Sequence, residues 1–167
     1  MLEVAIEADE EWDSSEAWQE LARAAAEAAI AESGYPELLT SCRPVELSVR
    51  LTGDEEVRGL NAQWRGKDKA TNVLSFPMAE EADLHQATMS ERELLLGDIV
   101  LAHGVCESEA ADKSLPLQRH AAHLIVHGTL HLLGFDHGDD AEASEMEGRE
   151  IRALARLGIA DPYEGAA

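Results

Sequence analysis

The most informative stretch of the sequence covers residues 127–137 and reads His127-Gly128-Thr129-Leu130-His131-Leu132-Leu133-Gly134-Phe135-Asp136-His137. His127 and His131 are four residues apart, so their imidazoles share one face of a helix. Gly134 permits the positive φ that ends a helix, and the reversal can bring His137 back to that face. A catalytic zinc site typically has three protein ligands, such as three imidazoles, and a fourth position that is open to water. The stretch therefore predicts one Zn²⁺ ion per chain, bound by His127, His131 and His137.

The glycine after the first histidine limits the class of enzyme. The three histidines have the spacing of metzincin zinc proteases, but those proteins carry a general-base Glu where this chain has Gly128. Loss of such a proton shuttle typically lowers the rate by about 10²–10⁴-fold. The pattern thus predicts a metal-dependent hydrolase that is not a standard protease. Asp136 is the nearest carboxylate in sequence, and it can orient a ligand, act as a base or only cap the turn.

The remaining histidines are expected to be ordinary core or surface side chains: His85, His103, His120 and His123. Two of them, His120 and His123, fall on roughly the same helical face as His127. For these two histidines, a second role therefore stays open: they could contact a metal-binding histidine without binding the metal themselves. Asp98 stands at the start of a predicted strand. It could lie near the site, or it could have only a structural role.

Hydrophobic periodicity around this stretch predicts alternating strands and helices. Strands are expected at 2–7, 45–51, 73–76 and 99–102, and helices at 15–33, 54–64, 103–111, 116–133 and 141–157. Ser14 or Ser15 is the expected N-cap of the first helix, and Asp54 that of the second. Residues 79–95 are expected to form an irregular acidic loop. We therefore predict a single α+β domain over residues 1–167, with a roughly four-stranded mixed sheet, about five helices and the metal site at the end of a helix.

Length and composition agree with one globular domain. The chain has 167 residues, of which 45% are hydrophobic and 28% charged, enough to build a core. No run approaches the roughly 20 apolar residues of a membrane span, and the first residues lack the basic and apolar regions of a signal peptide. The two Cys residues fit a reducing compartment. We therefore expect a cytoplasmic protein without a membrane partner.

The charge is unevenly distributed along the chain. The net charge is −21, and it is concentrated at both ends, in residues 1–33 and 136–164. Residues 58–76 instead form a basic island with a net charge of +3: Arg58, Arg65, Lys67 and Lys69 against Asp68. The overall acidity excludes a protein that coats nucleic acid through bulk charge. It does not exclude a small basic site, and an Arg on a turn matches phosphate oxygens bidentately.

Three stretches together resemble the YbeY family of metal-dependent endoribonucleases that mature ribosomal RNA. They are Arg-Gly-Lys-Asp-Lys-Ala-Thr-Asn-Val-Leu-Ser-Phe-Pro at 65–77, Leu-Gly-Asp-Ile-Val at 96–100, and the histidine stretch at 127–137. The resemblance implies an α+β fold, zinc on the three histidines, and the functional Arg of the family at Arg65. Asn72 stands where the family often has Asp, and Phe135 where it often has Tyr; neither change is expected to disturb metal binding.

The activity implied by the resemblance is cleavage of single-stranded ribosomal RNA, not DNA. It implies a role in 3′-end maturation of small-subunit ribosomal RNA and in late ribosome quality control, with the small subunit or its proteins as partners. In this hypothesis Arg65 neutralises charge that develops on the phosphoryl oxygens. Two alternatives are a non-catalytic, zinc-stabilised ribosome-assembly or RNA-binding factor, and a zinc peptidase or amidase. Both water and the 2′-hydroxyl of the RNA are candidate nucleophiles.

Overall fold

A four-stranded sheet forms the centre of the molecule in the computed structural model, which describes residues 2–12, 15–85 and 92–163. Its strands are β1 (Leu2–Ala8), β2 (Val45–Thr52), β3 (Val73–Pro77) and β4 (Leu94–Ala102), in the order β1-β2-β4-β3. The first two pairs are parallel, and β3 runs antiparallel to β4 at the edge of the sheet. The sheet is therefore mixed, as predicted, and one long side of β3 is left without a neighbouring strand.

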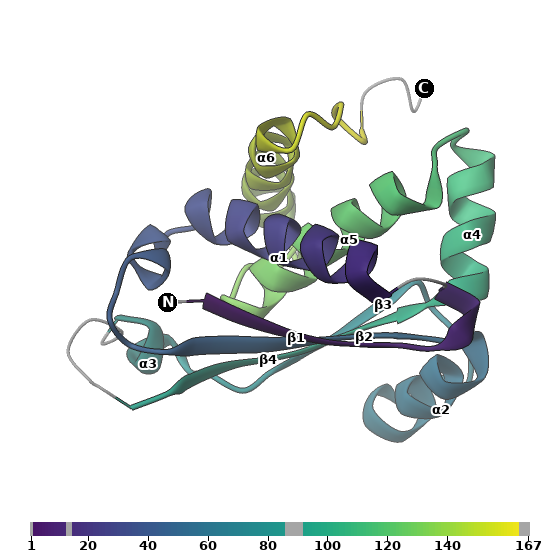
Figure 1. The fold of residues 1–167 in the computed structure, drawn as a ribbon, viewed down its shortest axis with the longest axis horizontal. Coiled ribbons are helices and arrows are strands. Elements are labelled where there is room, and N and C mark those ends of the chain that lie inside the picture. The colour runs from purple at the N-terminus through teal and green to yellow at the C-terminus, as the bar shows by residue number, and fades with distance from the viewer. Residues whose placement is uncertain (1, 13–14, 86–91, 164–167) are drawn as a thin grey trace.

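Helices cover both faces of this sheet (Figure 1). The helices are α1 (Ser15–Ala31), α2 (Asp54–Arg65), α3 (Glu81–His85), α4 (His103–Asp112), α5 (Leu117–Leu132) and α6 (Asp140–Arg156), with 3₁₀ turns η1 (Glu10–Trp12) and η2 (Pro36–Leu39). Helices α1, α5 and α6 lie on one side of the sheet, and α2 lies on the other (Figure 1). None of the helices in the described part of the chain is long and apolar enough to cross a membrane.

The main core lies between the sheet and helices α1, α5 and α6. The Ala-rich face of α1, with Ala22, Ala25 and Ala29 fully buried, lets this helix approach α5 closely. A smaller core under α2 contains Val57, Leu74, Val100 and Ala102. Side chains alternate along a strand. Consequently, β3 directs Leu74 toward α2 and Ser75 toward α5, and it contributes to both faces.

Most predicted elements are present, but two expectations need correction. The region expected to be a loop, 79–95, contains α3 and the start of β4, so the described part of the chain has six helices rather than five. Residues 86–91 of that region lie outside the described residues. The last strand begins at Leu94 because Leu94 and Leu96 are buried, and a bulge opposite Glu46 and Leu47 absorbs the change of register.

The second correction concerns the helix caps. The N-cap of α2 is Gly53, and Asp54 is the first helical residue. The Asp54 carboxylate instead accepts a 3.1 Å hydrogen bond from the backbone N–H of Val105, which caps the first turn of α4. Ser14, one of the two expected caps of the first helix, lies outside the described residues.

Candidate active site

Helix α5 and the turn after it bring the three predicted ligands together. Pro116 precedes the first turn of α5, and Gly134 has the predicted positive φ, at 94°. Hydrogen bonds from Gly134 N to His131 O and from Phe135 N to Leu130 O close the end of the helix. The chain then reverses, and the ring of His137 lies 5.6 Å from that of His127 and 5.2 Å from that of His131, between centroids. One ring nitrogen from each His lies within 4.8 Å of the others.

The geometry of these nitrogens fits a tetrahedral metal ion. The Nε2 atoms of His127 and His131 are 3.1 Å apart. Two nitrogens at 2.0–2.1 Å from an ion, at a tetrahedral angle, would be separated by about 3.3 Å. Burial, followed by the neighbouring imidazoles of His127 and His137, lowers the pKa of His131 to about 4. The ring is therefore neutral at neutral pH, which is the form that binds a metal.

A buried carboxylate from α6 holds the first of the three histidines. Glu150 is 1% exposed, and its Oε1 accepts a 2.5 Å hydrogen bond from His127 Nδ1. The other carboxylate oxygen accepts a 2.6 Å hydrogen bond from the Tyr163 hydroxyl, and His123 Nε2 lies 3.7 Å from Oε1. Burial raises the pKa of Glu150, but contacts with His123, His127 and Tyr163 outweigh it and lower the pKa to about 2. The ionised carboxylate places the hydrogen of His127 on Nδ1 and leaves its Nε2 lone pair free for a metal.

Sequence reasoning missed Glu150 and Tyr163. Glu150 is one of nine acidic residues in the segment 136–164, and its charge alone does not distinguish it from its solvent-exposed neighbours. The available signal was its spacing from Met146 and Ala153, both buried, which places Glu150 on the inner face of α6. His123, one of the two histidines left open, lies 3.7 Å from Glu150 and so next to the carboxylate that contacts His127.

The close contact of α5 with the sheet explains the glycine between the ligands. A Cβ atom at Gly128 would lie 3.0 Å from Ile99 Cγ2 and 3.1 Å from Ser75 Oγ. These contacts are tighter than ordinary packing, and a larger side chain would have to displace β3 or β4. Side chains of the sheet therefore occupy the space that the general-base Glu of metzincins would need at this position.

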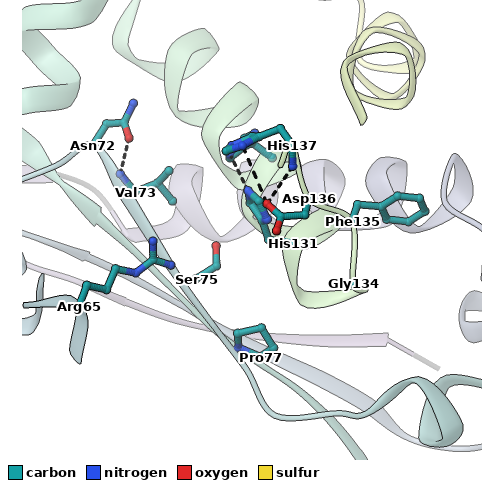
Figure 2. A pocket seen from close by; sticks show the side chains of 11 residues that line it. Arg65, Asn72, Val73, Ser75, Pro77, His131, Gly134, Phe135, Asp136 and His137 are labelled. Carbon is teal, nitrogen blue, oxygen red and sulfur yellow. Dashed lines mark hydrogen bonds and ion pairs between the residues drawn. The ribbon is translucent and has the colours of Figure 1, made fainter. Parts of the chain in front are cut away.

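A cleft of about 500 Å³ opens beside the three histidines. It is lined by Arg65, Asn72, Val73, Ser75, Pro77, His127, His131, Gly134, Phe135, Asp136 and His137. Figure 2 shows the Arg65 side chain extending toward Ser75, on the side of the cleft opposite His131 and His137. Arg65 comes from α2, so it reaches the cleft around the free edge of β3. The structure thus brings the predicted Arg and the three predicted histidines into one cleft.

Two other polar residues of the cleft are held by local hydrogen bonds. The backbone N–H of His137 donates to Asp136 Oδ1 over 2.8 Å, so this carboxylate caps its own turn. Asn72 accepts from Val73 N at 2.7 Å and donates from Nδ2 to Glu109 at 3.0 Å. A carboxylate could not donate to Glu109, so Asn fits this position better than Asp. Asp98 is exposed on β4 and does not line the cleft.

Comparisons with known proteins relate the chain to one family. The family model described as Endoribonuclease YbeY matches residues 4–158. The chain belongs to the YbeY family. A relative from Rhizorhabdus wittichii named Endoribonuclease YbeY is 52% identical over 165 residues, covering 98% of this chain and 97% of its own length. A second, from Sphingopyxis alaskensis and of the same name, is 48% identical and covers 98% of both chains. The predicted family membership is therefore confirmed.

The fold agrees with a solved structure as well. The solution structure of TM1509 from Thermotoga maritima has a TM-score of 0.54 at 22% identity, covering 98% of this chain and 99% of the other. Similarity at this level of identity concerns the fold alone. It supports the same overall α+β architecture for this chain.

Proposed function

We propose that this member of an endoribonuclease family, acting as a single domain over residues 1–167, cleaves single-stranded ribosomal RNA with one bound Zn²⁺ ion. We assign it to the cytoplasm, to 3′-end maturation of small-subunit ribosomal RNA and to late ribosome quality control. The observation that carries the proposal is that one cleft is lined both by a cation and by the three imidazoles. The Arg65 guanidinium lies across this cleft from His127, His131 and His137.

The histidines would hold the ion, and Glu150 would hold the histidines. His127, His131 and His137 offer three nitrogen ligands, and the hydrogen bond to Glu150 fixes the tautomer and orientation of His127. When bound, a zinc ion supplies Lewis acidity and lowers the pKa of a bound water from 15.7 to about 7. Imidazole also suits nickel and copper, so the metal in a purified sample need not be the physiological one.

Arg65 would act on the phosphate. Its guanidinium has no ion-pair partner among the described residues, so its charge is available to a ligand. A planar guanidinium binds two phosphoryl oxygens at once, and a cation preorganised beside them stabilises the charge that develops during cleavage. Gly128 leaves no room for a carboxylate at the metzincin base position, which favours RNA over peptide hydrolysis for this site.

The net charge of −21 limits how RNA reaches this cleft. Long-range attraction between the acidic body and RNA is feeble, so binding depends on the cleft, the metal and a partner that delivers the substrate. We assign that partner to the small ribosomal subunit or its proteins. Cleavage of naked RNA by the isolated protein is then slow and sensitive to salt and added metal. Vigorous cleavage at high salt without a partner would contradict this assignment.

The decisive experiment is a paired assay with metal-loaded protein and its His131→Ala variant. Single-stranded RNA and unstructured peptides are offered side by side. Turnover of RNA at many cuts per protein molecule, absent in the variant, supports the proposal. Binding of RNA without turnover would indicate a zinc-stabilised assembly factor instead. Cleavage of peptides alone would indicate a peptidase, and equal RNA cleavage by the variant would indicate a contaminating nuclease.

A further inference from the structure

Trp64 is the most exposed large hydrophobic side chain in the described part of the chain. Its exposed fraction is 65%, whereas the two other tryptophans, Trp12 and Trp18, are buried at 1% and 5%. Trp64 follows Val57 by seven residues and Leu60 by four, so it lies on the same side of α2 as the residues that pack on the sheet. Val57, Leu60 and Trp64 thus form one apolar stripe along α2. Trp64 lies beyond the small core under this helix, and nothing in the described chain covers it.

The loop after α2 is folded back against the helix end that carries Trp64. Gly66 adopts the left-handed conformation with φ of 70°, and Lys67 N donates to Asn61 O over 3.2 Å. The buried side chain of Asn61 donates to the carbonyl of Lys69 at 2.8 Å. Asn61 thus fixes the loop through two hydrogen bonds, one that it accepts and one that it donates. The backbone of Lys67 and Lys69 is therefore held against the last turns of α2, the helix end that carries Trp64 and Arg65.

Among the described residues, one of the four cations at this end of α2 and in the loop after it is paired with an acid and three are not. Arg58 is bound to Asp68 through two hydrogen bonds of 2.8 and 3.1 Å. The three remaining cations, Arg65, Lys67 and Lys69, have no ion-pair partner among the residues that the structure describes. An exposed indole beside three available cations, on an otherwise acidic protein, is complementary to single-stranded nucleic acid. Such proteins combine a cationic groove for the backbone with aromatic side chains on which bases stack.

The helix end is also next to the cleft. Arg65 follows Trp64 directly and lines the cleft together with Ser75 and Pro77 of β3. Among the residues that the structure describes, no strand lies on the outer side of β3, so a single strand of RNA can cross this edge from the α2 side to the histidine side. We propose that Trp64 is a substrate-binding residue that stacks on an unpaired base close to the scissile phosphate, while Lys67 and Lys69 contact the RNA backbone. This inference rests on the proposed function and names the contact that makes the site select unpaired RNA.

The positions of the tryptophans give a direct measurement. Because Trp12 and Trp18 are buried, quenching of the fluorescence by a stacked base reports on Trp64. Zn²⁺-loaded protein is mixed rapidly with a short single-stranded RNA, so that binding is read before cleavage. We expect strong quenching with single-stranded RNA and little with the same sequence in a duplex, whose bases are not free to stack on an indole.

Variants of Trp64 and of the RNA test the stacking contact. Trp64→Ala should weaken RNA binding by about tenfold, within the range for loss of one stacked base, while Trp64→Phe retains most of the affinity but not the fluorescence change. Replacing successive bases of the RNA by abasic sites should reproduce the loss at one position in the wild-type protein only. Leu95→Ala removes another exposed apolar side chain, on β4, and should leave affinity unchanged.

The two proposals fail differently. If the wild-type protein binds and cuts RNA but Trp64→Ala binds equally well, stacking by Trp64 is overturned and the proposed function stands. Equal quenching by duplex RNA also overturns it, because the contact would then not select unpaired bases. If wild-type protein neither binds nor cuts single-stranded RNA, the proposed function itself is wrong, and this inference with it.

Discussion

The carboxylate of Glu150 accepts a 2.5 Å hydrogen bond from Nδ1 of His127, across 23 residues of sequence and from a different helix. The same carboxylate accepts a hydrogen bond from the hydroxyl of Tyr163, close to the end of the described chain. Helix α6 therefore packs on α5 and also orients one of the three clustered histidines.

Glu150→Gln should weaken zinc binding by about 10–100-fold, the usual cost of losing an outer carboxylate. An amide can still accept the hydrogen bond, but it does not supply the negative charge that strengthens the ligand. The affinity is measured by competition with a coloured chelator, and the visible spectrum of the Co²⁺ form reports the geometry. Glu147→Gln, at an exposed position of the same helix, is the control. Unchanged affinity in Glu150→Gln would refute the role assigned to Glu150.

Arg65→Ala should lower RNA cleavage by about 10²–10³-fold, as removal of one preorganised donor often does, while the zinc content stays unchanged. His131→Ala should lose both zinc and cleavage, because it removes a ligand. The two variants are compared by metal analysis and by initial cleavage rates on one RNA. Arg58→Ala is the matched control, since this cation is bound to Asp68 and does not line the cleft. Full activity of Arg65→Ala would remove Arg65 from the mechanism.

Substitutions at Gly128 test the close contact between α5 and the sheet. Gly128→Ala gains about 1 kcal/mol of helix propensity but must displace Ile99 or Ser75, which typically costs about 1–3 kcal/mol. We expect a net loss of roughly 1 kcal/mol in unfolding free energy, and a far larger loss for Gly128→Glu. Gly59→Ala is the control, because nothing lies within 4 Å of its Cβ position on α2.

Gly59→Ala should instead be stabilising, by about 0.5–1 kcal/mol. Both changes are measured by urea unfolding of metal-free protein, so that zinc does not mask the difference. If Gly128→Ala proves as stabilising as Gly59→Ala, the sheet does not limit this position. The absence of a general base would then need a different explanation.

The sequence contained enough information for most elements and for the grouping of the three histidines, but not for the contacts between elements. The spacing of His127 and His131 and the left-handed Gly134 are local properties, and they were predicted correctly. The role of Asp54 was wrong because its partner, the N–H of Val105, is 51 residues away. Glu150 was missed for the same reason, since only the packing of α6 on α5 distinguishes it from the acidic residues around it. The strand at 94–102 was predicted too short because the acidic composition of residues 79–95 obscured the alternation that begins at Leu94.

The last prediction concerns the attachment of α6 to α1, which keeps Glu150 in place. The Glu32 carboxylate lies 3.2 Å from Arg152 and 2.6 Å from Arg156, and its backbone carbonyl accepts a 2.7 Å hydrogen bond from Arg149. The hydrogen bond from Arg156 is the main cause that lowers the pKa of Glu32, with burial opposing it and Arg152 adding to it. A lowered pKa in the folded state stabilises the protein above the unfolded pKa, and this contribution is lost as the pH falls through the folded value.

Glu32→Gln should therefore reduce the melting temperature at pH 7, and the difference from wild type should shrink as the pH falls below about 4.3, the unfolded value of a Glu. The effect is small, below about 1 kcal/mol, because both arginine side chains are more than half exposed and screened by solvent. Removing one acid also relieves repulsion in a chain of net charge −21. Glu20 lies on α1, the helix that ends just before Glu32 in the chain, and has no described ion pair. Glu20→Gln therefore measures that general effect of removing one acid, and its change is subtracted. A corrected difference that stays constant between pH 7 and pH 3 would show that the Glu32 ion pairs contribute nothing to folding.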